Sequence, residues 1–522
     1  MTAVRSPPRA GARNDNAVLV PLRDSTMTAP SPRVDRTEFR QQMAELISNR
    51  SREFDGDDPW WAIAAKQPKP PGPLPEETAT ETPDARPEEH SEPTVPCHDG
   101  RLADQFVPLA PRSLAEARIG HSQVEALILK LLSNRATATG KEVAEQIKLP
   151  FGLMQEALRR MKEERLVVYK AAAPMSDYVH ELTELGFERA RRYSEQCTYF
   201  GAAPVSLDQY VNSVHAQSIR KLRASLADLR MAFSDLVLGE GILSQLGQAI
   251  SSGLGLFLYG SSGNGKSSIA ERVTDAFGEG IWIPRAISAL GEIIRLYDPS
   301  NHVALSWQAP DATLTEDEID RRWIFIRRPT IVVGGELTMD NLEITTNRAT
   351  GLGEAPLQMK SNGGTLVIDD FGRQRMRPSE LLNRWIVPLE KRYDFLNLAS
   401  GRKIQVPFDQ LIIFSTNLEP RDLVDEAFLR RIPYKIDVCD PSEQEFRDLF
   451  RQLANSMGIQ YDAKVLDYLV QSHYTATGRS LRFCHPRDLL HQVRVYCDFL
   501  DRPAAITREA IDAAAKNYFA MM

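Results

Sequence analysis

Hydrophobic positions along this chain follow two patterns, and each pattern predicts a different kind of element. In residues 121–134 and 150–164, apolar side chains recur every three or four positions, which is typical of amphipathic helices. Three runs farther along, at 256–259, 365–368 and 411–414, are apolar at every position. Such runs predict strands of a parallel sheet that is buried on both faces. We therefore expect an α/β core that follows a smaller, mainly helical region.

The region at 113–200 has a distinct order of predicted elements. Between the two periodic helices, Thr139 and Glu142 have the spacing of a capping box, which predicts a short helix that ends near Ile147. After the second periodic helix come two extended stretches and a charged helix. Three helices followed by a hairpin resemble a winged helix-turn-helix domain.

The third predicted helix of this domain carries several basic side chains, which raises the question of its partner. The basic residues are Arg159, Arg160, Lys162 and Arg165, with Lys170 on the strand that follows. Side chains of this kind contact nucleic-acid phosphates. Glu156, Glu163 and Glu164 dilute the positive charge, and a mixed charged face is equally typical of a protein-docking domain. DNA binding through 113–200 and protein docking therefore stay equal alternatives.

The rest of the chain divides by composition. Residues 1–112 are rich in Pro, Ser, Thr and acidic residues, so they bury too little apolar surface to offset their ordering entropy. We predict a mostly disordered tail there, with a short helix over 36–50. Residues 201–236 predict one or two linking helices. The α/β core is expected at 237–440, and four helical stretches at 441–522 predict a lid.

One glycine-rich loop carries the clearest chemical signal. The first apolar run leads into GSSGNGKS, which has the form G-x-x-x-x-G-K-[ST], and then into an amphipathic helix. In this setting the loop turns its backbone N–H groups around phosphates at the positive end of the helix dipole. The predicted phosphate-binding residues are Gly260, Ser261, Ser262, Gly263, Asn264, Gly265, Lys266, Ser267 and Ser268. Lys266 is expected to reach the outer phosphates of ATP, and Ser267 to bind Mg²⁺.

Polar residues end the other two apolar strands. Asp369 and Asp370 follow TLVI, and Asn417 ends LIIFSTN. Because ligands of open α/β sheets bind at the carboxyl ends of the strands, we expect all three to face the loop. Asp369 is predicted to hold Mg²⁺, directly or through water, and Asn417 to orient the attacking water. Asp370 is predicted to act as a base that is slower than the more usual glutamate, because its side chain is one methylene shorter.

Together these motifs resemble the AAA+ ATPases, and the resemblance covers about 235–522. GSSGNGKS is similar to the Walker A motif of that family, TLVIDD to Walker B and FSTN to sensor 1. DEAFLRR implies an arginine finger at Arg431, with Arg430 as the second choice, and HPRDLL implies a sensor 2 at Arg487. Two alternating strands around 400–401 resemble the hairpin before sensor 1 in MoxR-like and enhancer-binding members. Because a finger acts on a neighbour's nucleotide, the resemblance implies a homo-oligomeric ring, a hexamer.

Composition limits the classes of function further. The chain has 522 residues, of which 42% are hydrophobic and 25% charged, as in ordinary soluble proteins. No apolar run is long enough to cross a bilayer, and no apolar segment follows the basic N-terminal residues, so we expect a cytoplasmic protein without membrane insertion. The net charge of −7 argues against non-specific nucleic-acid binding by the whole molecule.

Two function hypotheses follow. The first is a Mg²⁺-dependent ATPase whose oligomeric ring remodels a protein or nucleoprotein target that the sequence does not identify. The alternative is a slow or non-hydrolysing ATP-gated switch that binds DNA or a protein through the domain at 113–200. A GTPase is disfavoured because the chain has no N-K-x-D motif. Turnover separates the two hypotheses, with Asp370→Asn expected to trap ATP and Asp370→Glu at least to preserve hydrolysis.

Overall fold

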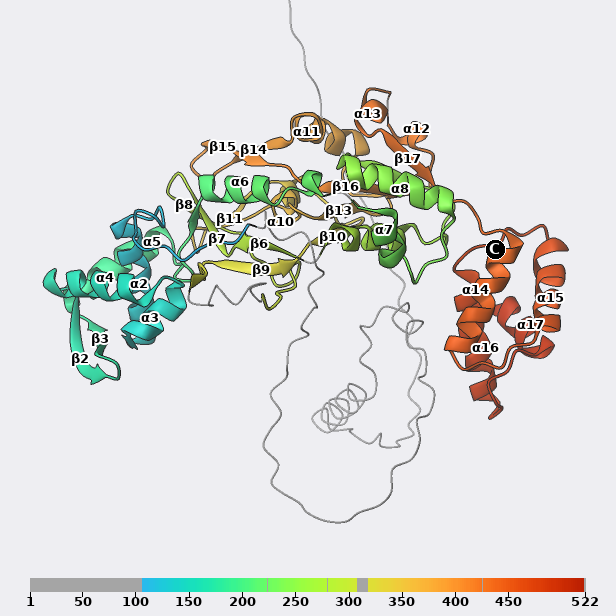
Figure 1. Ribbon diagram of the computed structural model, residues 1–522, viewed down its shortest axis with the longest axis horizontal. Helices are drawn as coiled ribbons and strands as arrows, with labels where there is room; N and C mark the ends of the chain where they lie inside the picture. Colours follow the sequence, from blue (N-terminus) through green and yellow to red (C-terminus); the bar gives the residue numbers. More distant parts are fainter. Residues whose placement is uncertain (1–105, 223, 279, 308–317, 425, 521–522) are drawn as a thin grey trace, which may run out of the picture. The chain divides into compact units, whose positions relative to one another are not determined.

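The computed structural model describes residues 106–520 except 223, 279, 308–317 and 425. The predicted helix over 36–50 and nearly all of the predicted tail lie outside this part of the chain. Figure 1 labels most of the helices and strands of the described part, which are numbered in chain order.

The N-terminal unit consists of three helices, a β-hairpin and a fourth helix. Its elements are α2 (His121–Arg135), β1 (Thr137–Thr139), α3 (Gly140–Ile147), α4 (Phe151–Glu163), β2 (Val167–Ala173), β3 (Asp177–Leu182) and α5 (Glu184–Gln196). The strands form an antiparallel sheet in the order β1-β3-β2. The Thr139 hydroxyl accepts the backbone N–H of Glu142, and the Glu142 carboxylate accepts the N–H of Thr139, so the predicted capping box is confirmed. The winged-helix assignment stays a prediction.

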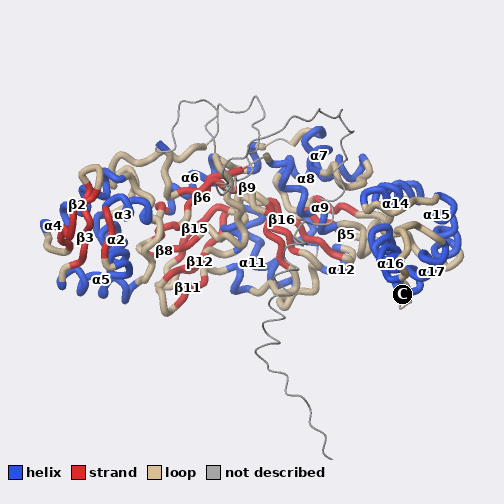
Figure 2. The backbone as a smooth tube through the Cα atoms, turned by 90° about the horizontal axis from the view of Figure 1, so that it is seen from below, coloured by secondary structure: helices blue, strands red, loops and turns tan. Residues whose placement is uncertain are grey.

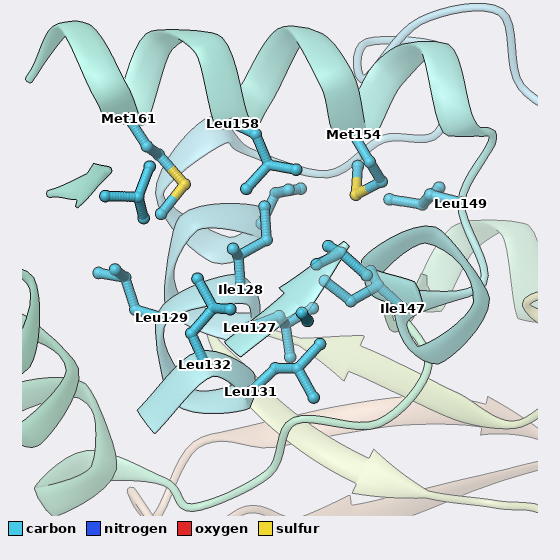
Figure 3. Close-up of a cluster of buried hydrophobic side chains, with 14 of the residues drawn as sticks. Leu127, Ile128, Leu129, Leu131, Leu132, Ile147, Leu149, Met154, Leu158 and Met161 are labelled. Atoms are coloured by element: carbon cyan, nitrogen blue, oxygen red, sulfur yellow. The ribbon is translucent and has the colours of Figure 1, made fainter. Parts of the chain in front are cut away.

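The core of this unit forms where the apolar faces of its helices meet. Leu127, Ile128 and Leu131 of α2 belong to the same buried cluster as Met154 and Leu158 of α4 (Figure 3), and all five are almost completely buried. These residues lie at the spacing of three and four that predicted the helices, because that spacing puts them on one helix face.

A five-stranded parallel sheet forms the centre of the chain. Its strands are β10 (Thr330–Val333), β13 (Thr365–Ile368), β16 (Leu411–Thr416), β5 (Leu256–Tyr259) and β17 (Tyr434–Asp437), in that spatial order. The three predicted apolar runs are therefore β5, β13 and β16. They occupy the three central positions, where neighbours on both sides exclude water from the backbone.

Successive side chains of these strands point to opposite faces of the sheet, and helices cover both faces. Leu256 and Leu258 of β5 contribute to the buried cluster on one face, and Phe257 contributes to the cluster on the other. The helices are α7 (Leu226–Ala232), α8 (Glu240–Ser252) and α9 (Lys266–Arg272) on the first face, and α11 (Pro378–Lys391) and α13 (Glu426–Arg431) on the second. Figure 2 shows α8 and α9 beside β5 and β16. The predicted α/β fold is confirmed.

A second β-layer is built mainly from residues between α9 and β13. Its five-stranded sheet contains β11 (Thr345–Asn347), β12 (Leu352–Glu354), β8 (Glu292–Arg295), β7 (Ala286–Ala289) and β4 (Val205–Ser206), in that order. Two antiparallel pairs adjoin it, β6 (Gly280–Pro284) with β9 (Trp323–Arg327), and β14 (Tyr393–Asn397) with β15 (Lys403–Pro407). The predicted linking region at 201–236 contains α6 (Leu207–Ala216) and α7, and it also supplies β4.

The β14–β15 hairpin is held to this second layer along its length and at its tip. Leu396 and Ile404 are buried in a cluster that the hairpin shares with the second layer. At the tip, the Glu292 carboxylate accepts the backbone N–H groups of Ala399 and Ser400, each at 3.0 Å. The predicted hairpin around 400–401 is therefore present as a fixed part of the fold.

The C-terminal unit is helical, as predicted. Its elements are α14 (Glu443–Ser456), α15 (Ala463–Leu469), a π-helical turn (Val470–Thr475), α16 (His485–Phe499) and α17 (Arg508–Tyr518). Phe446, Phe450, Leu466 and Leu490 belong to its buried core. In the part of the chain that the structure describes, no helix combines the length and the apolar character needed to cross a membrane.

Candidate functional site

The glycine-rich loop joins β5 to α9, as its motif predicts. Gly260 follows β5 with φ +129°, and Gly265 precedes α9 with φ +80°. A Cβ atom on Gly260 would lie 2.7 Å from the Val438 carbonyl oxygen. Glycine is therefore required at both positions for backbone conformation, and at Gly260 also for space. The loop has the tight backbone course on which phosphate cradles depend.

Lys266 lies beneath this loop and connects it to the end of β16. Its ammonium group donates to the carbonyl oxygens of Gly260 (3.0 Å) and Ser261 (2.9 Å) and to Oδ1 of Asn417 (2.7 Å). The side chain is buried, and burial lowers the pKa of Lys266, while the carboxylates of Asp369 and Asp370 oppose that shift. Two of its three partners are backbone groups of the loop itself, so Lys266 also fixes the shape of the cradle.

Ser267 and Asp369 meet across the edge of the sheet. The Ser267 hydroxyl donates to Oδ2 of Asp369 at 2.7 Å, and the backbone N–H of Asp369 donates to the Val333 carbonyl oxygen at 2.8 Å. One hydroxyl and one carboxylate are oxygen ligands that suit Mg²⁺, which usually keeps several waters and takes few protein ligands. The residues therefore fit the predicted ion. Among the described residues, no group of three or more His, Cys, Asp or Glu side chains forms another metal-binding cluster.

Asp370 and Asn417 meet at the next position along the same edge. Nδ2 of Asn417 donates to Oδ1 of Asp370 at 3.2 Å, while Oδ1 of Asn417 accepts from Lys266. Asp370 is exposed, and its backbone has the left-handed φ of +47°. Lys266, Ser267, Asp369, Asp370 and Asn417 thus form one hydrogen-bonded group, which we call the strand-end cluster.

The other residues of the loop have different environments. Ser262 is exposed, and Ser261 and Ser268 are partly exposed. The Asn264 amide is buried, and it donates to Oδ1 of Asp440 at 2.7 Å and to the Val438 carbonyl oxygen at 3.3 Å. These bonds tie the loop to the residues that follow β17.

Contacts of Asp440, Arg482 and Cys484 at this loop were not predicted. Asp440 binds Asn264 and also pairs with Arg482, and the backbone N–H of Cys484 donates to the Gly263 carbonyl oxygen at 2.9 Å. The C-terminal unit therefore contacts the loop through the segment that precedes α16. The only sequence signal for Arg482 was its position five residues before the predicted Arg487, and for Asp440 its position after the last apolar strand.

Two of the three predicted arginines pair with carboxylates outside the cluster, and the third is exposed. Nε of Arg431 donates to Glu390 of α11 at 2.7 Å, and Arg430 is exposed on α13. Arg487, at the start of α16, pairs with Asp488 of the same helix at 2.8 Å. The strand-end cluster is bonded through contacts among its own members, so its geometry does not depend on these arginines.

Comparison with known proteins gives one family match and several similar folds. The family model described as Domain of unknown function (DUF8689) matches residues 442–517, in the C-terminal helical unit. No curated protein matches the sequence.

Solved structures similar to the chain include NtrX from Brucella abortus and RuvB from Thermotoga maritima. NtrX is 16% identical, and the match covers 57% of this chain and 59% of that chain with a TM-score of 0.35. RuvB, described as a Holliday junction branch migration motor, is 11% identical over 57% of this chain and 73% of that chain, with a TM-score of 0.32. This chain therefore spans about three-fifths of the NtrX chain. At this level of similarity, any assignment of function depends on the residues of the site.

Proposed function

We propose that this chain is a Mg²⁺-dependent ATPase of the AAA+ class, which binds and hydrolyses ATP. The observation that supports the proposal is the chain of hydrogen bonds from Lys266 through Asn417 to Asp370. It joins the glycine-rich loop to two strand ends at one edge of a parallel sheet, where ligands of α/β folds bind. A glycine-rich turn without a catalytic role would not need a buried lysine and two polar strand ends in contact.

Each member of the strand-end cluster has a role in this proposal. The loop and Lys266 bind the phosphates of ATP, while Ser267 and Asp369 hold Mg²⁺, which neutralises charge on the outer phosphates. Asn417 orients the attacking water, and Asp370 takes its proton. A protein promotes phosphoryl transfer mainly by positioning the reacting groups and by stabilising charge. The fixed arrangement of the cluster is therefore its main contribution to catalysis.

The oligomeric part of the proposal depends on the arginines. Arg430, Arg431 and Arg487 belong to elements outside the cluster, as expected for groups that act on a neighbour's nucleotide or after movement of the C-terminal unit. We propose a cytoplasmic homo-oligomeric ring, a hexamer, that remodels a protein or nucleoprotein target. Arg431 stays the first choice for the finger and Arg430 the second. Arg431 pairs with Glu390, whereas Arg430 is exposed, so both must be tested.

Measurement of turnover in the assembled protein tests the central claim. Purified full-length chain should release phosphate from ATP in the presence of Mg²⁺, at a rate that rises as oligomers form. The Lys266→Ala variant supplies the background. Assembled wild type that releases no more phosphate than this variant would refute the ATPase proposal.

The second candidate is an ATP-gated switch, and one observation favours it. Asp370 is short, exposed and held in a left-handed conformation, so its reach towards a water beside the outer phosphate is limited. A misplacement of about 1 Å can cost on the order of a hundredfold in rate. ATP-dependent assembly without turnover, measured by light scattering beside phosphate release, would support the switch.

The N-terminal unit is proposed to select the target through protein contacts. Three of its exposed basic residues are paired with carboxylates of the same unit, which leaves less net positive charge for a phosphate backbone. The pairs are Arg159–Glu163, Arg160–Glu164 and Lys170–Glu181, with N···O distances of 4.0, 3.0 and 3.2 Å. A DNA duplex that binds the wild type at low salt, but not the variant with Arg159 and Arg160 changed to Glu, would favour DNA binding instead.

A further inference from the structure

The turn that follows β13 has an unusual backbone course. Asp370 has φ +47°, a region that residues other than glycine seldom adopt, and Gly372 has φ +105°. The backbone N–H of Phe371 donates to the Ser415 carbonyl oxygen at 2.7 Å, and the Thr416 hydroxyl donates to the Phe371 carbonyl oxygen at 3.0 Å. Phe371 is therefore bonded to β16, the strand that Asn417 directly follows.

The Gln374 side chain makes three hydrogen bonds to backbone groups of this turn. Its Nε2 donates to the carbonyl oxygens of Asp369 (2.9 Å) and Asp370 (3.2 Å), and its Oε1 accepts the backbone N–H of Gly372 (2.8 Å). The donor end of the amide thus holds the two peptide groups that flank Asp370, and its acceptor end holds the turn at Gly372. None of these bonds goes to the glycine-rich loop or to a predicted Mg²⁺ ligand side chain.

We infer that Gln374 is a positioning residue for hydrolysis, because it holds the backbone of Asp370 in the conformation that directs the carboxylate at Asn417. The inference deepens the proposed function and rests on it. Asn417 and Arg373 contact the Asp370 carboxylate at 3.2 and 4.0 Å, so a change in the backbone of Asp370 would move the carboxylate away from both. A shift of about 1 Å at a reacting group can lower a rate on the order of a hundredfold. Two of the three bonds of Gln374 hold the peptide groups on either side of Asp370, the residue whose short side chain leaves least tolerance for such a shift.

The competing explanation is that Gln374 only stabilises the turn and has no influence on the reaction. The two explanations predict different kinetics. A positioning residue alters kcat through Asp370 and leaves the affinity for ATP almost unchanged, because the phosphate cradle is made by other residues. A residue that only stabilises the fold lowers the amount of folded protein, and its effect does not depend on what occupies position 370.

Two replacements with side chains close to glutamine in size separate the contribution of the amide oxygen from that of the amide nitrogen. Gln374→Glu keeps the acceptor for Gly372 and removes the donors to Asp369 and Asp370, whereas Gln374→Met removes all three bonds without adding charge. We expect both to lower kcat roughly tenfold to a hundredfold, with the KM for ATP within about twofold of wild type. Gln405→Glu, on an exposed position of β15, is the matched control for the added charge and should behave as wild type. Thermal melting checks that every variant is folded.

The decisive measurement repeats both replacements in an Asp370→Asn background under single-turnover conditions. If Gln374 acts through Asp370, the loss of rate should shrink to less than about twofold in that background. An equal loss in both backgrounds, a raised KM with unchanged kcat, or a loss in Gln374→Glu but not in Gln374→Met would each overturn the inference while leaving the ATPase intact. A wild type without hydrolysis would overturn both the inference and the proposed function.

Discussion

The strand-end cluster and the arginine-bearing segments are proposed to act on one nucleotide, yet they are built differently. The cluster is held by hydrogen bonds among its own side chains, with Lys266 buried between the loop and Asn417. Arg431 and Arg487 instead pair with carboxylates beside them, and Arg430 is exposed. The strand-end cluster is therefore already organised within a single chain.

ATP binding and completion of the catalytic site are therefore proposed to depend on different parts of the molecule. A single chain already holds the residues proposed to bind phosphate and Mg²⁺ in contact with one another. The arginines must leave their present carboxylate partners, or approach a neighbouring chain, before they can act. We infer that ATP binding precedes assembly of the full site, and the following experiments test that order.

Loss of the buried lysine should have the largest effect. Lys266→Ala removes the cation proposed to bind the outer phosphates and also removes two hydrogen bonds to the loop and one to Asn417. We expect ATP hydrolysis to fall at least about a thousandfold, with loss of ATP affinity. Phosphate release and titration with a fluorescent ATP analogue measure the two effects. Lys403→Ala, on the exposed side of β15, is the control, and equal losses in both variants would show that the site is elsewhere.

Neutralising the proposed base should separate binding from chemistry. Asp370→Asn keeps the size of the side chain and removes its proton-accepting charge, so hydrolysis should fall a few hundredfold while ATP stays bound. Retention of radiolabelled ATP on the isolated oligomer measures this directly. If hydrolysis in Asp370→Asn equals that of the wild type, Asp370 is not the base.

Mixed oligomers test whether the arginines act between chains. We expect Arg431→Ala to lower hydrolysis about a hundredfold, since one charge that stabilises the transition state is lost. Lys266→Ala chains keep their arginines but cannot use ATP, so mixing the two inactive variants should restore activity. Arg430→Ala, tested in the same way, decides between the adjacent arginines. No recovery in either mixture would place the arginines in the same chain as the nucleotide that they act on.

The start of α16, which carries Arg487, should lose stability in mild acid. Burial lowers the pKa of His485 from 6.5 to about 4, and the ring is packed against Tyr474 at a hydrogen-bonded distance of 3.0 Å. Between these pH values the unfolded chain binds more protons than the folded one. The stability that neutral His485 provides is therefore complete above pH 6.5 and is lost as the pH falls towards 4, with a maximum of about 3 kcal/mol.

Urea unfolding at pH 7.5 and pH 5 measures this effect. His485→Leu should show a smaller difference in unfolding free energy between the two pH values than the wild type. His491→Gln, at an exposed position of the same helix, is the control and should keep the wild-type difference. A wild-type difference that persists in His485→Leu would assign the acid sensitivity to other groups.

The smallest expected effect concerns the shape of the turn at Asp370. Asp adopts left-handed φ values more readily than Glu does, because its short side chain bonds locally to the backbone. Asp370→Glu should therefore preserve turnover but lower the free energy of unfolding by about 1 kcal/mol. Chemical denaturation measures the change, with Asp340→Glu at a position that is exposed and not left-handed as the control. A variant as stable as the wild type would show that the backbone conformation imposes no cost on Glu.

The sequence predicts the cluster well because its parts follow local rules. The loop has glycines at the positions that require positive φ, and the runs at 256–259, 365–368 and 411–414 are apolar throughout because strands β5, β13 and β16 are buried on both faces. The order of the strands then brings Lys266 and Asn417 together. The glycine positions and the apolar runs each need only a short window of sequence, and the rule that ligands of α/β sheets bind at the carboxyl ends of the strands supplies the rest.

The contacts that were missed depend on long separations in sequence. Asn264 and Asp440 are 176 positions apart, and no motif spacing connects them. The second β-layer takes β4 from the predicted linking helices because two residues, Val205 and Ser206, suffice to extend the edge of a sheet. The left-handed turn at Asp370 likewise depends on Gln374 and on β16, which a pattern of hydrophobicity does not reveal.

The hydrogen bonds that Glu292 accepts from the β14–β15 hairpin have a consequence for sequence variation. Glu292 holds the tip through the backbone N–H groups of Ala399 and Ser400, which every residue except proline supplies. The Ala399 side chain is therefore free to change among related chains without releasing the tip, whereas the Ser400 hydroxyl also bonds the Glu292 carboxylate, which has no backbone substitute. Related sequences should conserve an acidic residue at 292 and exclude proline from both tip positions, while the side chain at 399 varies.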